Sequence, residues 1–511
     1  MTDSPTLHKP DAIVIGAGLG GLSTAAHLAA CGLRPLVLER YAVLGGSTHV
    51  FRRKNEWEFD CGVHYIGDCG PGGEVPTLLH GLGVDDRIEW LEMDRDGFDR
   101  IIGPDLELKV PVGWENYEAE LIRTFPGEER ALRRYVRIMR RLGTNWDRSL
   151  TPASNAGLAK WLKNSGGAAS IAFAPHAGLM MSLGLSPRTI LAMSVQSGAM
   201  ATTPQVAPVA LHAGYLNDYV GNGGHFPRGG GQMLSAAFAE VIQSHGGEIR
   251  THAHVEKILI EGGRVTGVRL AGGEVIHSDV VVSDADIKRT FSDLVGYEHL
   301  PRAYALRARQ WKMAPPLINA FFGVEIDLSN TPNSNYFAIP NWDGASSLAS
   351  LELMTRRLLR NPGWRDPIKW AKDYAANQPG FVQCSTRRDP SNTRSAPAGS
   401  AAIEVQTLAP PNPRLWGLSA EQVKDGSYRK TAQYKEIKQI IQDGLLDRIE
   451  QTYPGARAKV RWSELGTPAT QERYTHTTLG NSYGLEPRIS QFGALRPRSR
   501  TPMAGLFVAG T

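Results

Sequence analysis

The sequence predicts an α/β protein in which a Rossmann-like nucleotide-binding domain is interrupted by a mixed α+β domain. Three observations predict this fold class. The start of the chain has the pattern of a buried strand, a glycine turn, an alanine-rich helix and a second strand. Two further segments, 226–286 and 495–511, carry similar strand patterns far from the first. The chain has 511 residues, more than one hydrophobic core usually supports, so we expect at least two domains.

Charge and cysteine content exclude several classes of protein. The chain carries 56 basic and 51 acidic residues, a net charge of +5, without the dense basic clusters of a nucleic-acid-binding protein. The spacing of Cys31, Cys61, Cys69 and Cys384 fits neither a disulfide framework nor a zinc site, so we expect no metal and a reducing compartment. Neither a signal peptide nor a run of about 18 apolar residues occurs. We therefore predict a cytoplasmic protein that does not span a bilayer.

The first strand–turn–helix unit has the features of a dinucleotide site. In "AIVIGAGLGGLSTAAHLAACGLRPLVLER", Gly16, Gly18 and Gly21 form a G-x-G-x-x-G turn, which leaves room for a pyrophosphate against the helix N-terminus. Glu39 follows Gly21 by 18 positions and ends the second strand, where a carboxylate can bind ribose hydroxyls. The other residues that we assign to this site are Leu19, Gly20 and Arg40.

A second glycine motif identifies the kind of dinucleotide. Gly45, Gly46 and Ser47 follow the acid in "RYAVLGGSTHVF". The order of strand, G-x-G-x-x-G, Glu and Gly-Gly resembles the FAD-binding superfamily of amine oxidases, phytoene desaturases and Rab GDP-dissociation inhibitors. This resemblance implies that the cofactor is FAD and that the doublet lets the backbone approach the pyrophosphate a second time. A plain Gly-Gly turn is the alternative interpretation.

Two later segments resemble further FAD blocks of that superfamily. The pattern of 226–286 predicts a glycine turn, a helix over 233–244 and strands that include 255–260 and 265–270. Val255 matches the family position whose backbone contacts adenine. The last segment, "LRPRSRTPMAGLFVAGT", resembles the strand at the flavin end of FAD, with Gly510 at its tip. The family normally continues from this glycine into a flavin-binding helix, so the resemblance implies a longer native chain.

These matches divide the chain into interleaved pieces. We predict an FAD-binding domain from 1–110, 223–290 and 488–511, and a substrate domain from 111–222 and 291–487. In the substrate domain, "HAGLMMSLGLSPRTILAMSVQSGAMATT" is rich in alanine, glycine, methionine and leucine. Such a composition suits helices packed around a long apolar cavity. An ordinary helical core is the alternative.

A basic amphipathic helix is expected in "ALRRYVRIMRRLG". One stripe of this helix carries Leu132, Tyr135, Ile138, Met139 and Leu142, and the arginines lie largely elsewhere. Such a helix can rest on the anionic inner face of a membrane, from which a lipid-like substrate would enter, so peripheral membrane contact is one interpretation. A solvated basic face on a core-packed helix is the other. The segment 355–364, "TRRLLRNPGW", is a weaker candidate of the same kind.

The stretch "FDCGVHYIGD" carries the candidate catalytic residues His64 and Tyr65 on a predicted strand. In the superfamily this strand passes the isoalloxazine ring, so the resemblance assigns Gly62 and Val63 to the cofactor. "GVHYIG" and the later "NSYGLEPRISQFGALRP" look most like the branch of retinol saturases, carotenoid isomerases and bacterial phytoene-desaturase-like proteins. Saturation needs a proton, and His64 or Tyr65 is the nearest candidate donor. Because neighbours on a strand point to opposite faces, we expect only one of them to face the flavin; structural roles for both are the alternative.

The resemblance implies an FAD-dependent oxidoreductase that acts on carbon–carbon double bonds of an apolar polyene or isoprenoid lipid, such as a carotenoid or retinoid. Desaturation, saturation and isomerisation would leave the same motifs. No second well-placed G-x-G-x-x-G occurs, so any NADPH would bind only transiently as a reductant. Two alternatives are a flavin amine oxidase and a non-enzymatic prenyl carrier of the GDP-dissociation-inhibitor type; the intact glycine motifs argue against the carrier. The sequence does not predict the oligomeric state.

Overall fold

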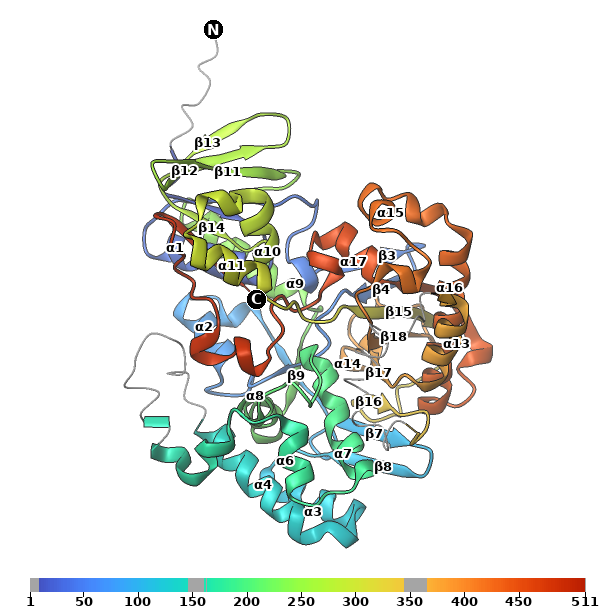
Figure 1. Cartoon of the computed structure of the whole chain (residues 1–511). Coiled ribbons are helices and arrows are strands. Elements are labelled where there is room, and N and C mark those ends of the chain that lie inside the picture. The colour runs from blue at the N-terminus through green and yellow to red at the C-terminus, as the bar shows by residue number, and fades with distance from the viewer. Residues whose placement is uncertain (1–8, 146–159, 162, 344–364, 511) are drawn as a thin grey trace.

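The computed structural model describes residues 9–145, 160–161, 163–343 and 365–510 (Figure 1). Within these ranges, five parallel strands form one sheet in the order β10-β2-β1-β14-β20. Their bounds are Glu248–Arg250, Pro35–Leu38, Ala12–Ile15, Val281–Ser283 and Leu506–Val508. The sheet therefore unites three segments that are distant in the sequence, and the predicted α/β fold class is confirmed.

Both faces of the parallel sheet are covered, as its uniformly apolar strands require. Helices α1 (Leu19–Ala30) and α9 (Gln232–Ser244) pack together with the sheet residues Val14 and Val37 in one core cluster. On the opposite face, β11, β12 and β13 form an antiparallel sheet that shares a core with Ile13 and Phe291. The bounds of these strands are Val255–Glu261, Arg264–Leu270 and Val275–His277. The helix and strands predicted over 233–270 are thus confirmed.

Seven strands of the described residues form a second, mostly antiparallel sheet in the order β19-β15-β18-β17-β16-β7-β8. The bounds are Val460–Gly466, Leu317–Val324, Ala401–Leu408, Gly380–Cys384, Asn335–Ala338, Asp99–Gly103 and Leu106–Val110. Helices α13 (Pro367–Asn377) and α16 (Ala432–Thr452) pack against it in a shared core. Strands β7 and β8 come from before residue 111, the position at which we place the start of the substrate domain.

A helical lobe packs against the end of the second sheet that carries β7 and β8 (Figure 1). Its helices are α3 (Trp114–Thr124), α4 (Glu129–Thr144), α6 (His176–Ser182), α7 (Pro187–Ser194) and α8 (Val209–Leu216). The predicted basic amphipathic helix is α4, which buries four of its five stripe residues completely and Ile138 in part.

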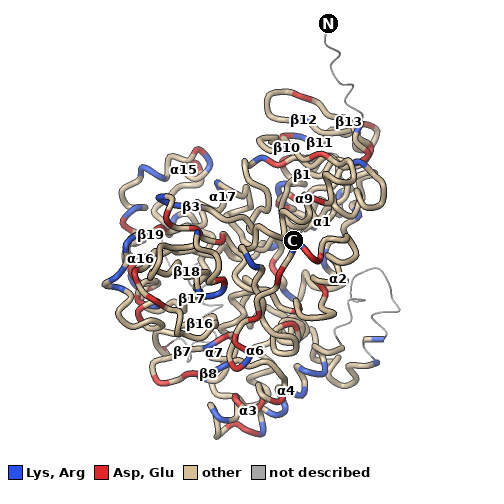
Figure 2. Tube along the Cα trace, turned by 180° about the vertical axis from the view of Figure 1, so that it is seen from behind, with Lys and Arg blue, Asp and Glu red and all other residues tan. Residues whose placement is uncertain are grey.

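The basic face of α4 is paired in part with acidic residues of α3, and both signs of charge occur along these helices (Figure 2). Arg133 contacts Glu118 on α3 and Glu129 on α4 at 2.6 and 2.9 Å, and Arg140 contacts Glu115 at 2.6 Å. The second candidate, 355–364, lies outside the described residues. No helix among the described residues has both the length and the apolar character to cross a membrane.

Shorter elements connect the two large sheets. Strands β3 (Val50–Arg53) and β4 (Trp57–Asp60) form a hairpin, and β5 (Ile66–Gly67) pairs with β9 (Gly224–Pro227), which also pairs with β6 (Trp90–Glu92). The remaining helices are α2 (Glu74–Gly81), α10 (Ile287–Arg289), α11 (Arg302–Gln310), α14 (Ser385–Arg388), α15 (Ala420–Asp425) and α17 (Pro468–Thr475).

The stretch "FDCGVHYIGD" is strand only at its two ends. Strand β4 ends at Asp60 and β5 begins at Ile66, and residues 61–65 have no regular secondary structure. The prediction that His64 and Tyr65 alternate across one strand is therefore wrong. The physical reason is that the chain leaves one small sheet and joins another here, so no single ladder of hydrogen bonds fixes the alternation.

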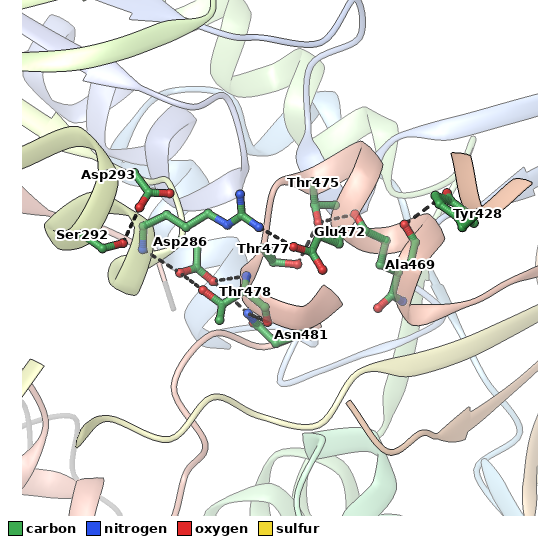
Figure 3. Close-up of polar contacts among 12 residues, drawn as sticks. Asp286, Ser292, Asp293, Tyr428, Ala469, Glu472, Thr475, Thr477, Thr478 and Asn481 are labelled. Atoms are coloured by element: carbon green, nitrogen blue, oxygen red, sulfur yellow. Dashed lines mark hydrogen bonds and ion pairs between the residues drawn. The ribbon is translucent and has the colours of Figure 1, made fainter. Parts of the chain in front are cut away.

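Asp286 joins the nucleotide half to the segment after α17. Its carboxylate caps α10 by accepting the backbone N–H groups of Lys288 and Arg289, at 3.0 and 3.1 Å. The same carboxylate accepts the backbone N–H and hydroxyl of Thr478 and the amide of Asn481, each at 2.8 Å (Figure 3). One partly buried carboxylate thus fixes the chain just before Tyr483.

Candidate cofactor and substrate site

The glycine turn between β1 and α1 forms a cradle without side chains. Gly18 caps α1, and a Cβ atom on Gly21 would lie 2.2 Å from the carbonyl oxygen of Gly16. A Cβ atom on Gly20 would lie 2.6 Å from the Cα atom of Gly510. The structure therefore brings the first glycine motif and Gly510 together, and Leu19 begins the helix beside them. Backbone N–H groups at a helix N-terminus favour an anion such as a pyrophosphate.

Glu39 lies at the edge of this cradle. Its carboxylate accepts the backbone N–H groups of Ala17 at 2.8 Å and Tyr41 at 2.6 Å, which orients it toward the glycine turn. The N–H group of Ala253 donates to the Glu39 carbonyl at 2.8 Å, so β11 begins with Val255 close to the end of β2. The guanidinium of the next residue, Arg40, donates to the carbonyl of Tyr474. The residues assigned to ribose and adenine therefore lie at one end of the cradle.

The Gly-Gly doublet packs directly on the first glycine turn. The N–H group of Gly45 donates to the carbonyl of Ala17 at 2.7 Å, and a Cβ atom on Gly46 would lie 3.2 Å from the Cα atom of Gly18. Gly45 has a φ of +111°, a conformation that favours glycine. The doublet is therefore more than an isolated turn.

Behind the doublet lie the residues assigned to the flavin. Ser47 belongs to the short helix that follows the doublet. A Cβ atom on Gly62 would lie 3.2 Å from the carbonyl oxygen of Ser47. Val63 is next to the second glycine block, since a Cβ atom on Gly231 would lie 2.9 Å from the Val63 Cβ. Ser47, Gly62 and Val63 thus lie next to the two glycine blocks, which is where the assignment to the cofactor places them.

Asp284 is a residue of this cradle that sequence reasoning missed. The N–H groups of Gly21 and Gly18 hydrogen-bond to its buried carboxylate. Cβ atoms on Gly18 and Gly20 would lie 2.7 and 2.5 Å from its oxygens. Burial raises the pKa of this carboxyl to about 7. The sequence signal for Asp284 was an acid directly after the predicted strand "DVVVS". Adjacent parallel strands end at the same edge of a sheet, so an acid at the end of this strand can reach the glycine turn that follows β1.

The cradle fits the pyrophosphate of FAD in its donors and its shape. Its glycine turn presents helix N–H groups, carries no side chains at Gly16, Gly18, Gly20 and Gly21, and lies beside the carboxylate of Glu39, which we assign to the ribose. The Asp284 carboxylate holds the position that a phosphate needs, so a bound phosphate has to displace or protonate it. This is the one feature of the cradle that opposes the cofactor.

An apolar cavity of about 260 Å³ lies between the helical lobe and the second sheet. Gly62 lines it, which places the cavity beside the surface assigned to the flavin. Both His64 and Tyr65 line it as well. Apolar and aromatic lining residues include Leu191, Val195, Ala199, Tyr215, Tyr219, Leu317, Phe337, Phe381 and Tyr483, and uncharged polar ones are Ser194, Ser197, Thr202, Thr203, Gln378 and Gln406. Part of the alanine- and methionine-rich stretch therefore forms a cavity wall.

His64 is buried and is 5% exposed. Its Nδ1 atom lies 3.4 Å from Oε2 of Glu404, and Phe381 packs beside its ring. Burial, assisted by the charge of Arg388, lowers the pKa of His64 to about 3. Burial also raises the pKa of Glu404 well above its usual value. The imidazole is therefore neutral at ordinary pH.

Tyr65 belongs to a different polar group. Its hydroxyl donates to Oδ2 of Asp99 at 3.1 Å and lies 2.7 Å from the hydroxyl of Tyr215. Asp99 is fully buried, and burial raises its pKa to about 6. Burial raises the pKa of both phenols well above 10, so they keep their protons. Sequence reasoning missed Asp99 and Tyr215; an acid inside the apolar strand pattern "FDRII" was the signal for the first.

The fold and the site define a class of protein, the FAD-binding oxidoreductases. Residues 19–325, more than half of the chain, match the family described as flavin containing amine oxidoreductase. The chain belongs to this family.

Three of its sequence relatives have names that refer to a retinoid or to carotenoids and their precursors. It is 26% identical to the all-trans-retinol 13,14-reductase of Danio rerio, over 98% of this chain and 82% of that protein. It is 25% identical to the chloroplastic prolycopene isomerase 1 of an Oncidium hybrid cultivar, over 98% and 79% of the two chains. It is also 26% identical to the neurosporene-forming phytoene desaturase of Cereibacter sphaeroides, over 99% and 91%.

Among solved structures, the fold is similar to that of a putrescine oxidase mutant, with a TM-score of 0.62 and 14% identity over 98% of this chain and 92% of that one. This likeness concerns the fold. The family match is what identifies the chain as a flavin-type oxidoreductase, in agreement with the sequence motifs.

Proposed function

We propose that this protein is an FAD-dependent oxidoreductase that acts on carbon–carbon double bonds of an apolar polyene or isoprenoid lipid, such as a retinoid or carotenoid. The observation that carries this proposal is the apolar cavity beside Gly62. Within the described residues, no Asp, Glu, Lys or Arg lines it. The names of the sequence relatives point in the same direction.

The cavity does not favour an amine substrate. An ammonium group needs a counter-ion or water when it enters an apolar site. Two carboxyl groups lie behind the wall: Asp99, whose oxygens accept hydrogen bonds from Tyr65, Gln196 and Asn335, and Glu404, 3.4 Å from Nδ1 of His64. Burial raises the pKa of both, which favours their neutral forms. A neutral polyene needs no such partner. The intact glycine cradle likewise favours flavin chemistry over a carrier function.

The residues of the chain bind, position and desolvate in this mechanism. The bound flavin supplies the hydride exchange at its N5 atom. The glycine cradle would hold the pyrophosphate and Glu39 the ribose, which sets the position of the ring next to Gly62. Aromatic side chains such as Phe337 and Phe381 line the cavity, exclude water and align an extended apolar chain.

Cofactor extraction followed by anaerobic substrate screening tests the proposed function. We expect purified protein to release FAD and its reduced form to react with a retinoid or carotenoid but not with amines. Re-reduction uses dithionite, because the physiological donor is not identified and NADPH is one candidate. Rapid reduction of the oxidised flavin by primary amines, with no response to polyenes, would overturn the proposal.

We also propose a peripheral membrane contact through α4, because an apolar substrate partitions into lipid. The arginines on the face opposite the buried stripe support this contact. The ion pairs of Arg133 and Arg140 with α3 reduce the positive charge that is available to anionic lipid. Co-sedimentation with vesicles of anionic lipid is the test, with neutral vesicles as the control. Binding that is salt-sensitive and weakened by Arg134→Gln with Arg137→Gln is expected; equal binding to both vesicles contradicts it.

A further inference from the structure

A buried carboxyl and two phenols form a hydrogen-bonded chain in the wall of the cavity. Asp99 begins β7, Tyr65 lies in the irregular segment 61–65, and Tyr215 comes from α8. The links are 3.1 Å from Tyr65 to Asp99 and 2.7 Å between the phenol oxygens. Both phenols line the cavity, and Asp99 lies behind them. The chain thus leads from a carboxyl to the substrate space.

The position of Asp99 is costly for a purely structural residue. It is 0% exposed, and its hydrogen-bond donors are neutral: Gln196 at 2.7 Å, Asn335 at 2.8 Å and Tyr65. A buried carboxylate without a hydrogen-bonded cation is unfavourable compared with an apolar residue of similar size. Burial holds a proton on this group to a higher pH than usual, with a pKa of about 6. Such groups concentrate at functional sites.

Tyr65 is held in place by groups other than Asp99. The hydroxyl of Tyr219 donates to the Tyr65 carbonyl at 3.4 Å, and the two rings pack with centroids 4.6 Å apart. Phe381 stacks on the other side at 5.9 Å. The phenol therefore keeps its orientation when its hydroxyl changes hydrogen-bond partner, which is what a proton-transferring group needs.

We propose that Asp99, Tyr65 and Tyr215 form a proton relay that delivers a proton to a carbon of the substrate, so that the reaction is a net saturation. This proposal rests on the proposed function. It assigns a direction to the chemistry and places the proton source at the phenols rather than at His64.

The atoms and electrons of the step balance. A bound reduced flavin would supply a hydride to one carbon of the double bond and would itself be oxidised. A phenol O–H at the cavity wall gives its proton to the other carbon, so two C–H bonds form and the π bond breaks. The phenol regains a proton along the chain from Asp99, which takes one from solvent. A two-electron donor, dithionite in the assay, reduces the flavin for the next turnover.

His64 lies on the same cavity, and its ring is neutral. Oε2 of Glu404 lies 3.4 Å from its Nδ1 atom, but neither ring nitrogen has a partner with hydrogen-bond geometry within the described residues. The hydroxyl of Tyr65, in contrast, has two such partners, Asp99 and Tyr215.

The experiment uses the FAD-loaded full chain, reduced under anaerobic conditions and mixed with a retinoid or carotenoid in D₂O. The variants are Tyr65→Phe, Tyr215→Phe and Asp99→Asn. Tyr434→Phe is the matched control, because it also removes a buried hydroxyl, one that pairs with Thr467 away from the cavity. FAD occupancy and the equilibrium dissociation constant of the polyene are measured for each variant.

We expect the wild-type product to carry two non-exchangeable deuterium atoms per double bond reduced, one from the phenol O–D and one from N5 of the flavin, which takes its hydrogen from solvent when dithionite reduces it. Tyr65→Phe and Asp99→Asn should slow flavin oxidation about 10²–10⁴-fold, with FAD occupancy and polyene affinity unchanged, and Tyr434→Phe should match the wild type. Equal rates in all four variants would overturn the relay.

The wild-type labelling is informative even where a variant does not fold. A geometric isomer without solvent deuterium overturns net saturation and leaves the proposed function standing. A reduced holoenzyme that neither binds a polyene nor is oxidised by one overturns both the relay and the proposed function. The two failures are therefore distinct.

Discussion

Asp284 occupies the anion position at the N-terminus of α1. Its carboxylate accepts the N–H groups of Gly18 and Gly21, which a pyrophosphate also needs, and the nearby Glu39 carboxylate adds a second negative charge. Two anions compete for one set of donors. The protonation state of Asp284 therefore decides how strongly the cradle attracts a phosphate.

We predict that FAD binds more weakly as the pH rises above 7. Burial raises the pKa of Asp284 to about 7, so below this pH the group is neutral and above it the group repels the phosphate. The dissociation constant should increase by up to about tenfold per pH unit above 7. Asp284→Asn should bind FAD more tightly at pH 8 and flatten this dependence. Fluorescence titration of apoprotein between pH 6 and 8.5 measures both, and identical slopes in the two proteins would refute the assignment.

His212 makes a separate contribution to stability. It is fully buried in the helical lobe and stacks on His176 with centroids 3.9 Å apart. Burial lowers the pKa of His212 to about 3. Its contribution to stability is therefore fully present above pH 6.5, the unfolded value, and is lost as the pH falls through this window toward 3.

We predict that His212→Phe makes the free energy of unfolding less dependent on pH between 6.5 and 4. The slope should decrease by up to about one proton. Other buried groups titrate in the same range, so the comparison is between the variant and the wild type at each pH. Urea denaturation at pH 7.5, 6 and 5 measures the difference. A parallel loss of stability at all three values would show that packing, rather than protonation, is what His212 contributes.

At the scale of elements, the segment 478–484 depends on a contact with the start of α10. Asp286 accepts hydrogen bonds from Thr478 and Asn481 while it caps the helix (Figure 3). The neighbouring pair Arg289–Glu472, at 2.5 Å, connects the same two regions. Because Tyr483 lines the cavity, this contact links the nucleotide half to the substrate space.

We predict that Asp286→Ala lowers the free energy of unfolding by about 1–3 kcal/mol, since it removes a helix cap and leaves buried donors unpaired. Hydrogen exchange should increase in 478–484 more than in α1. Asp286→Asn keeps an acceptor and should have a smaller effect. Exchange that rises equally throughout the chain would indicate global destabilisation rather than release of this segment.

At the scale of the whole molecule, the cofactor surface draws on three separate pieces of chain. Gly18, Asp284 and Gly510 follow β1, β14 and β20, and they meet only because these strands are adjacent in one sheet. A ligand that binds this surface stabilises the arrangement of all three pieces, since it binds the folded state alone.

We predict that FAD stabilises the whole chain rather than one region. At a free concentration 100 times the dissociation constant, the gain is about 2.7 kcal/mol. Differential scanning calorimetry of apoprotein and holoprotein should show one transition that moves to higher temperature. A shift in only one of two resolved transitions would mean that the substrate half unfolds independently of the nucleotide half.

Local patterns predicted the parts of this fold that depend on local backbone geometry. The glycine turn at Gly16–Gly21, the helices α1 and α9 and the strands β10, β11, β12 and β14 lie where periodicity and glycine spacing place them. Glu39, Gly45 and Gly62 could be assigned to the cofactor because each occupies a defined place in the family's motifs, and this assignment stays a prediction. The alternation of His64 and Tyr65 could not, because it assumed a strand that ends at Asp60.

The sequence by itself determined that this protein is an α/β oxidoreductase with an FAD site, because a nucleotide cradle is made of backbone and its glycines are readable in order. Only the tertiary structure decided that Asp284 enters that cradle, that β7 and β8 join the second sheet, and that Asp99 and Tyr215 reach Tyr65. These contacts join residues that are 34 to 268 positions apart in the sequence. Nothing in the local pattern around a single acid or tyrosine records its distant partner, since burial and hydrogen bonding arise only when the separate elements pack.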